Sequence, residues 1–399
     1  MGRDGGDACE LVGAFEMVRI AALDSLVMAL GGGETTRLIG GVVRDTLLGQ
    51  PVSDIDMATR LTPDEVIARL KTAGVKSVPT GIAHGTVTAV LPSGPVEITT
   101  LRRDVSTDGR RATVAFTDDW REDAARRDFS INALSANPET GEVFDYFGGR
   151  DDLAAGIVRF IGDPLQRISE DHLRILRFFR FFARFGKGDP DPAAYEACAA
   201  RANDLMALSR ERIASELLKL LSYPTPVVAI RLMLARGILK PVLPEIITVD
   251  ALDALVVREG SGGDPIRRFA ALIGPNPAVA QDIAKRLKLS KAHGKRLATA
   301  CGSTLPITSI PALAYRIGSE GARDRLLLSG GDPAPLDSWK RPTLPVTGGT
   351  LITRGLEPGP IVAQTLAAIE DAWIDAGFPS GDDFDALLER LIPAKPSQS

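Results

Sequence analysis

Residues 38–59, LIGGVVRDTLLGQPVSDIDMAT, constrain the fold of this 399-residue chain more than any other segment. Gly40 and Gly41 precede a predicted short helix, so backbone N–H groups at the helix N-terminus could meet phosphate oxygens. Asp54 and Asp56 follow on a predicted strand, where residues i and i+2 point to the same face. Two carboxylates placed in this way suit the divalent cations used in phosphoryl transfer. The segment therefore predicts a phosphate-binding turn beside a metal site.

The aspartate pair alone is weak evidence, because surface loops often contain such pairs by chance. The glycine and Arg-Asp motif nine residues upstream of Asp54 makes a chance pair a poorer explanation. Glu97 is the natural third carboxylate, because it is predicted to face away from its apolar strand neighbours Val96 and Ile98. A solvated position on an edge strand is the alternative for Glu97.

Composition indicates a soluble globular protein with more than one domain, since 44% of residues are apolar and 25% are charged. No apolar run approaches the roughly 18 residues that a membrane span needs. The acidic N-terminus does not resemble a signal peptide, and three scattered cysteines have no metal-ligand spacing, so we expect a cytoplasmic location. A net charge of −4 argues against indiscriminate coating of nucleic acid but allows a local basic groove.

The sequence pattern changes near residue 150. Before that point, strands are predicted around residues 37–40, 54–58, 84–91 and 96–100, with helices at 15–30, 42–48 and from Thr62 onward, and a mobile loop at 102–112. Beyond it only helices are predicted, at 169–185, 209–221, 226–236, 264–273, 279–288 and 360–376, with a linker at 330–349. We expect a flexible leader (1–13), an α+β head (14–147), a helical neck (148–222) and a helical body and tail (223–399).

Arg126, Arg127 and Asp128 form a charged cluster beside an apolar run. Two adjacent cations could neutralise phosphate charge, and the carboxylate could accept hydrogen bonds from a ribose hydroxyl. A surface salt-bridge cluster is the alternative.

Residues 168–185, ISEDHLRILRFFRFFARF, predict one continuous helix capped by Ser169. Asp171 is predicted to share a helix face with Arg174, and further arginines follow at 177, 180 and 184. Such a stripe is usually a solvated face, but an Asp beside an Arg supplies the acceptors and donors needed to read a base edge. The basic patch at 285–296, KRLKLSKAHGKR, could contact RNA phosphates or be an ordinary exposed helix end.

These motifs together resemble the class II tRNA nucleotidyltransferases and the bacterial poly(A) polymerases that share their catalytic head. The resemblance is strong over residues 35–220 and looser beyond. It rests on the GGxVRD and DxD element, the RRD at 126–128, DYFGGRDDL at 145–153, EDxxRxxR at 170–177 and SRERIASE at 209–216. It implies a polymerase-β-like head with a mixed sheet and helices, a helical neck that reads the base, and a helical body and tail that hold tRNA.

The resemblance also implies a site and a reaction. Asp54 and Asp56 would bind Mg²⁺, with Glu97 as a possible third ligand or base, and Asp171 and Arg174 would pair with CTP or ATP. The residues implied to bind the nucleotide are Gly40, Gly41, Arg44, Arg127, Asp128, Asp171, Arg174, Arg177 and Arg180. The expected reaction is template-independent addition of C-C-A to the 3′ end of tRNA with release of pyrophosphate. Neither a membrane nor a protein partner is implied.

Several relatives remain as alternatives. The poly(A) polymerases typically carry a basic segment before the second sheet strand and a Lys/Arg-rich tail, whereas residues 80–88 here read TGIAHGTVT and the chain ends in KPSQS. Both departures favour CCA addition, and the complete segment 102–112 favours the full activity over CC-only or A-only addition. Without a His-Asp pair, no appended phosphohydrolase domain is expected. An RNA-binding protein with an inactive head is the non-enzyme alternative.

Overall fold

The computed structural model describes residues 21–392 except 53, 109–110, 261–262 and 303–308. The chain forms two compact units, Met1–Pro244 and Glu245–Ser399. The leader expected at 1–13 and the start of the helix expected at 15–30 lie outside the described residues. The finer division into head, neck, body and tail stays a prediction.

A mixed seven-stranded sheet forms the core of the first unit's N-terminal part, as the sequence predicts. Its strand order is β3-β4-β5-β2-β1-β8-β9, and β2 and β5 are its parallel neighbours. The strands are β1 (Thr36–Ile39), β2 (Ile55–Thr59), β3 (Lys76–Gly81), β4 (Thr86–Leu91), β5 (Gly94–Thr100), β8 (Ser135–Ala136) and β9 (Val143–Phe144). The helices that accompany them are α2 (Ala21–Ala29), α3 (Gly41–Leu47), α4 (Pro63–Thr72) and α5 (Trp120–Ala125).

Helix α4 begins where its local sequence predicts. The Thr62 side chain accepts from the Glu65 N–H, the Glu65 side chain accepts from the Thr62 N–H, and Pro63 occupies the first turn. This reciprocal pair satisfies two N–H groups that a helix N-terminus otherwise leaves unbonded.

Two expectations for this part of the chain are wrong. The segment at 102–112 is not a loop, because β6 (Arg102–Asp108) and β7 (Arg111–Phe116) form a separate antiparallel hairpin. Strand β3 was not expected, since it is largely exposed and contains Pro79. A proline is tolerated at the edge of a sheet, where its missing N–H breaks no ladder.

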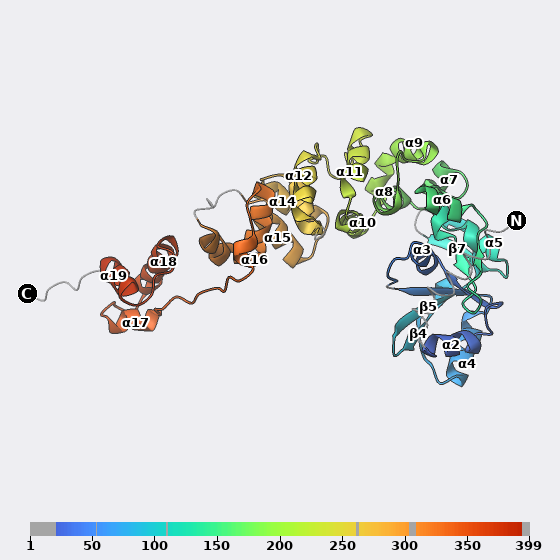
Figure 1. The fold of residues 1–399 in the computed structure, drawn as a ribbon, viewed down its shortest axis with the longest axis horizontal. Coiled ribbons are helices and arrows are strands. Elements are labelled where there is room, and N and C mark those ends of the chain that lie inside the picture. Colours follow the sequence, from blue (N-terminus) through green and yellow to red (C-terminus); the bar gives the residue numbers. More distant parts are fainter. Residues whose placement is uncertain (1–20, 53, 109–110, 261–262, 303–308, 393–399) are drawn as a thin grey trace, which may run out of the picture. The chain divides into compact units, whose positions relative to one another are not determined.

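Beyond β9 the described residues form helices and connecting segments, with one isolated β-bridge at Phe160 (Figure 1). The first unit continues with α6 (Gly149–Ala155), α7 (Pro164–Glu170), α8 (Arg174–Phe185), α9 (Pro192–Ala200), α10 (Arg210–Ser222) and α11 (Pro226–Ala235). Aromatic side chains hold α8 against the segment that follows Arg127. The ring of Phe129 lies 5.4 Å from that of Phe181 and 6.3 Å from that of Phe178. This buried cluster sets where the arginines of α8 stand.

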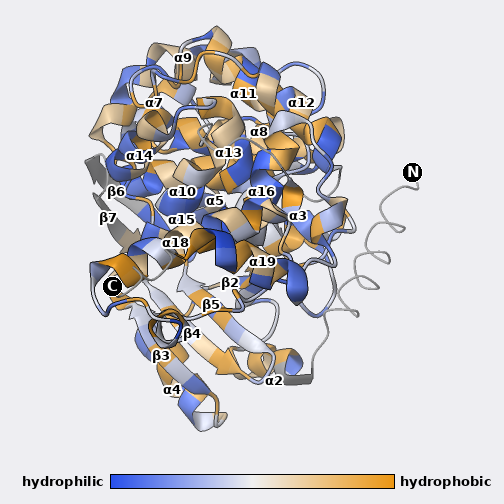
Figure 2. Ribbon diagram, turned by 90° about the vertical axis from the view of Figure 1, so that its left-hand side faces the viewer, coloured by the Kyte–Doolittle hydropathy of each residue, from blue (hydrophilic) through white to orange (hydrophobic). Residues whose placement is uncertain are grey.

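The second unit is helical throughout its described part. Its helices are α12 (Asp250–Glu259), α13 (Pro265–Ile273), α14 (Pro277–Arg286), α15 (Lys291–Ala300), α16 (Ile310–Ser329), α17 (Gly348–Thr353), α18 (Pro360–Asp375) and α19 (Asp382–Leu391). The expected linker lies between α16 and α17, yet Leu336 and Val346 within it are buried against the helices. Hydrophilic and hydrophobic residues mix along α16 and α19 (Figure 2), and no helix in the described ranges could cross a membrane.

Candidate active site

Three carboxylates lie together at one edge of the parallel strand pair. Asp56 in β2 is directly opposite Glu97 in β5, and Asp54 stands just before β2 begins. Met57 and Ile98 are fully buried, so the alternation of the strands turns Asp56 and Glu97 to the other face, as predicted. Burial raises the pKa of the Asp56 carboxyl, and the charges of Glu97 and Asp54 add to the rise while Arg127 opposes it.

This arrangement fits a divalent cation. Besides burial, the charges of Glu97 and Asp54 raise the pKa of Asp56, and a bound cation would relieve that repulsion. Among the described residues, no three His, Cys, Asp or Glu side chains are grouped closely enough to enclose a metal by themselves. Mg²⁺ commonly binds through one or two carboxylates together with substrate phosphates. Asp54 and Asp56 can therefore supply the protein half of such a site.

The glycine turn opens helix α3 beside these carboxylates. Gly40 has φ 64°, a left-handed conformation that suits glycine, and Gly41 begins the helix. Arg44 is only 5% exposed, and burial lowers the pKa of its guanidinium. Arg44 donates from Nη1 to Asn132 Oδ1 (2.5 Å) and from Nε to Asp45 Oδ1 (2.9 Å). These two partners hold the cation in place.

Arg126 and Arg127 are both anchored by the buried carboxylate of Asp123. Arg126 Nε lies 2.9 Å from Asp123 Oδ1, and Arg127 Nη2 lies 3.1 Å from Asp123 Oδ2. Burial raises the pKa of Asp123, but the two arginines outweigh it and the pKa is lowered overall. Arg167 of α7 donates to the carbonyl oxygens of both arginines, which ties α7 to this segment.

Asp128 is buried, and both of its carboxylate oxygens are bonded. Oδ1 accepts from Asn132 (3.0 Å), while Oδ2 accepts from Arg177 Nε (2.6 Å). Burial raises the pKa of Asp128, but the charge of Arg177 and these hydrogen bonds outweigh it, so the pKa lies below its ordinary value. Its observed partners make Asp128 a support for Arg177, and its predicted contact with a ribose hydroxyl is untested.

The helix expected at 169–185 is two helices, α7 and α8, so Ser169 does not cap it. Asp163 caps α7, and the Ser169 hydroxyl donates to the Gln166 carbonyl inside that helix. Asp171 lies between the two helices in extended backbone, with φ −150°. Its Oδ1 accepts from the Leu173 N–H, which supports the turn into α8. The shared helix face expected for Asp171 and Arg174 is therefore absent, although both line one pocket.

The pair Asp171 and Arg174 is held from two sides. Arg174 donates to Glu170 Oε2 (2.6 Å) and to the Arg167 carbonyl (2.8 Å). Asp171 Oδ2 accepts from Arg212 of α10 at 2.8 Å. Both oxygens of Asp171 already accept one hydrogen bond each, and each has a second lone pair with which it could accept from a ligand. On the same helix, Arg180 pairs with Glu216 and Arg184 with Asp45.

A cavity of about 440 Å³ collects nearly all of these side chains. Ten of its twelve lining residues are ones the sequence predicts: Gly40, Gly41, Arg44, Asp56, Arg127, Asp128, Asp171, Arg174, Arg177 and Arg180. Asp54 and Glu97 do not line it and stand beside Asp56. Asn132 and Phe181 line it but were not predicted. The signal for Phe181 was local, because it follows Arg177 by four residues on helix α8, whereas Asn132 contacts Arg44, 88 residues away in the sequence, and had no such signal.

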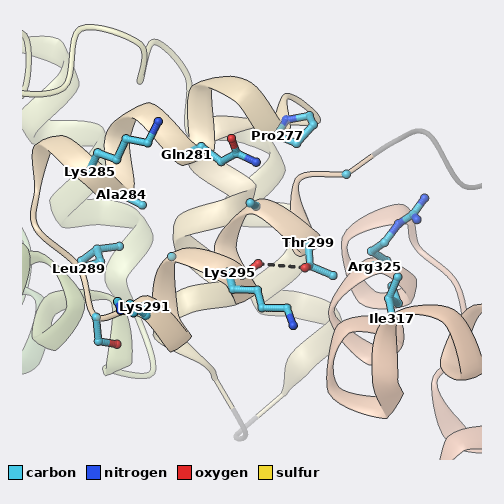
Figure 3. Close-up of a pocket in the computed structure, with 14 residues that line it drawn as sticks. Pro277, Gln281, Ala284, Lys285, Leu289, Lys291, Lys295, Thr299, Ile317 and Arg325 are labelled. Carbon is cyan, nitrogen blue, oxygen red and sulfur yellow. Dashed lines mark hydrogen bonds between the residues drawn. The ribbon is translucent and has the colours of Figure 1, made fainter.

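The basic patch at 285–296 belongs to the second unit and lines a different groove. It covers the end of α14, the turn after it and the start of α15 (Figure 3).

Two family models match the chain. Residues 36–159 match the Poly A polymerase head domain, and residues 189–249 match a probable RNA and SrmB-binding site of polymerase A. The mitochondrial CCA tRNA nucleotidyltransferase 1 of Homo sapiens is 35% identical over 87% of this chain and 84% of its own length. This chain belongs to the CCA tRNA nucleotidyltransferase family.

Other members of the family agree with that assignment. The CCA-adding enzyme of Streptococcus sanguinis is 32% identical over 94% of this chain and 97% of its own length. The crystal structure of the Bacillus stearothermophilus CCA-adding enzyme with CTP has a TM-score of 0.70 at 24% identity, covering 96% of this chain and 97% of that one. The Thermotoga maritima enzyme complexed with tRNA has a TM-score of 0.66 at 20% identity, covering 96% and 98%. These structures share the fold of the head and the helical remainder.

Proposed function

We propose that this protein adds C-C-A to the 3′ end of tRNA, using CTP and ATP and releasing pyrophosphate. The observation that carries the proposal is that a glycine turn at a helix N-terminus, a carboxylate cluster and the Asp171 and Arg174 side chains all adjoin one cavity. The family assignment supports the same activity, because the relatives named above are CCA tRNA nucleotidyltransferases and CCA-adding enzymes.

In the proposed reaction, the 3′ oxygen of the tRNA attacks the α-phosphorus of the nucleotide. A new P–O bond forms there as the bond to the pyrophosphate oxygen breaks, and the hydroxyl proton leaves to a base. Arg44 and the N–H groups of the Gly40–Gly41 turn would hold the triphosphate, and Arg127 would balance its charge. Asp54 and Asp56 would hold Mg²⁺, which when bound lowers the pKa of the attacking hydroxyl and neutralises the leaving group. Glu97 would accept the proton or complete the ligand set.

Choice of base would come from Asp171 and Arg174. Cytosine and adenine each present an amino donor beside a ring-nitrogen acceptor on the pairing edge. The Asp171 carboxylate accepts from the amino group, while Arg174 donates to the ring nitrogen. Uracil and guanine present a carbonyl oxygen and a ring N–H instead. The Asp171 carboxylate would then face another acceptor, the carbonyl oxygen, and Arg174 would face another donor, the N–H.

Poly(A) polymerase is the second candidate, because the matching head model is named for it. The segment 80–88, which joins β3 to β4, has His84 as its only basic residue, and this favours CCA addition. A cytoplasmic location stays a prediction, and the mammalian relatives are mitochondrial by name.

The test offers purified protein a tRNA transcript that ends at the discriminator base, with CTP, ATP, both, or all four triphosphates. We expect three added nucleotides, C-C-A, followed by arrest. A growing A ladder on unrelated RNA would identify a poly(A) polymerase. Binding of RNA with no Mg²⁺-dependent incorporation on any RNA would show an inactive head.

A further inference from the structure

Phe181 of α8 is the only apolar side chain among the described residues that line the cavity of the candidate active site. Its ring is only 5% exposed, and it stacks on the ring of Phe185 with centroids 6.1 Å apart. A buried ring can simply fill space. The other neighbours of Phe181, however, are cations, and these give the ring a second role.

Three arginines from two different helices stand over this ring. The guanidinium carbon of Arg180 lies 4.2 Å from the ring centroid, that of Arg177 lies 5.2 Å away and that of Arg44 lies 5.4 Å away. Arg177 and Arg180 belong to α8, whereas Arg44 belongs to α3. All three distances fall within the roughly 6 Å over which an aromatic face attracts a cation.

The carboxylates that pair with these arginines do not bring the three cations together. Each arginine has a different partner: Asp45 for Arg44, Asp128 for Arg177 and Glu216 for Arg180. What the three arginines share is the ring of Phe181. Like charges gathered around one buried ring repel one another, so their common position needs a group that attracts all of them.

Arg44 depends most on aromatic contact, because its side chain is the least exposed of the three at 6%. Burial lowers the pKa of its guanidinium, which shows that the cation has lost hydration. Its guanidinium carbon also lies 4.5 Å from the centroid of Phe185. The stacked rings of Phe181 and Phe185 therefore replace part of the lost water.

An aromatic ring suits this position better than a carboxylate or an aliphatic side chain. A carboxylate would attract the arginines, but its negative charge would repel a triphosphate in the same cavity. A leucine would fill the space but would not offset the repulsion between the arginines. The quadrupole of an aromatic ring attracts cations without adding net charge, so the arginines keep their full charge for the ligand.

We propose that Phe181 is a positioning residue for the nucleotide, which holds Arg44 of α3 together with Arg177 and Arg180 of α8 so that all three meet one ligand. The inference rests on the proposed function for the identity of that nucleotide. Within the described part of the chain, Arg174 does not stand over this ring. Phe181 should therefore affect the affinity for CTP and ATP alike and leave the choice of base unchanged.

The test replaces Phe181 with phenylalanines that carry one, two or three ring fluorines, which weaken the quadrupole stepwise while changing the shape of the ring little. Phe179 carries the same fluorines as the control, because it is fully buried on the same helix and its ring contacts are with Phe178 and Tyr195. Kd for CTP is measured by isothermal titration calorimetry without RNA. Kd should rise with each fluorine at position 181, by about five- to tenfold with three, and should stay close to the wild-type value at position 179.

Phe181→Leu and Phe181→Tyr give a second measurement with natural residues. Leucine should weaken CTP binding about as much as three fluorines do, and tyrosine, which keeps the quadrupole, should restore it. A Kd that is independent of fluorine number, or that changes equally at position 179, would overturn the positioning role even if C-C-A addition is intact. Graded CTP binding by a protein that adds no nucleotide to any RNA would instead contradict the proposed function and leave the role of Phe181 standing.

Discussion

Replacing Arg184 with glutamine should weaken nucleotide binding without changing which base is selected. Arg184 of α8 donates to Asp45 Oδ2 at 3.0 Å, and Asp45 in turn holds Arg44, which we propose binds the triphosphate. The Arg184 and Asp45 side chains are 26% and 13% exposed, so the strength of this ion pair should be intermediate between those of a surface pair and a buried pair. We therefore expect the free energy of nucleotide binding to weaken by about 1–1.4 kcal/mol, which corresponds to about a five- to tenfold rise in KM for CTP and ATP.

Asp45→Asn should cost more, because the 5% exposed Arg44 then loses its charged partner. We expect the free energy of nucleotide binding to weaken by about 2–4 kcal/mol when such a buried cation loses its partner. KM for CTP and ATP should therefore rise at least about 30-fold. Arg236→Gln, which breaks the exposed pair with Glu196, serves as the matched control. The assay is steady-state incorporation at varied CTP and ATP. If Arg184→Gln matches the control in KM, or alters base choice instead, the proposed route from α8 to the phosphate turn is wrong.

Three further predictions concern the carboxylates. Asp56→Asn should abolish addition yet raise Tm near pH 7.5 by about 1–3 °C, because the raised pKa of Asp56 means that its ionised form destabilises the fold. The gain in Tm should vanish at low pH, where Asp56 is already protonated. An unchanged or lower Tm near pH 7.5 would refute this prediction. The apparent pKa on the acid side of the pH profile of kcat/KM should lie above the ordinary aspartate pKa of 3.8. It should move to lower pH as the Mg²⁺ concentration is raised, since metal and proton compete for Asp56. An apparent pKa that does not change with Mg²⁺ would contradict the metal site. Glu97→Gln should lower kcat at least tenfold with KM for CTP within threefold; wild-type kcat would remove Glu97 from the reaction.

Features set by short-range chemistry could be predicted from the sequence. The capping box of α4 and the alternation that exposes Glu97 between buried Val96 and Ile98 both depend on neighbouring residues. The chemistry of the candidate site could also be predicted, because charged residue types at fixed spacings limit what a segment can bind. Ten of the twelve cavity-lining residues were accordingly in the predicted set.

Features set by distant partners could not be predicted. The break between α7 and α8 has no signal in the apolar period, and it places Asp171 where Arg212, 41 residues later, can hold it. Strand β3 is exposed and depends on pairing with β4 rather than on its own pattern. Asn132 belongs to the site because it bridges Asp128 in its own segment to Arg44 of α3, 88 residues earlier in the sequence.

We infer that the head carboxylates carry out the nucleotidyl transfer, whereas α8 and the turn before it select the base. Single-turnover incorporation by Arg174→Ala with each of the four triphosphates tests this most directly, with Arg201→Ala as a control outside the cavity. Discrimination against UTP and GTP should fall at least about tenfold, a loss of roughly 1.4 kcal/mol, while the apparent affinity for triphosphate should change less than threefold. Undiminished selectivity for C and A in Arg174→Ala would contradict it.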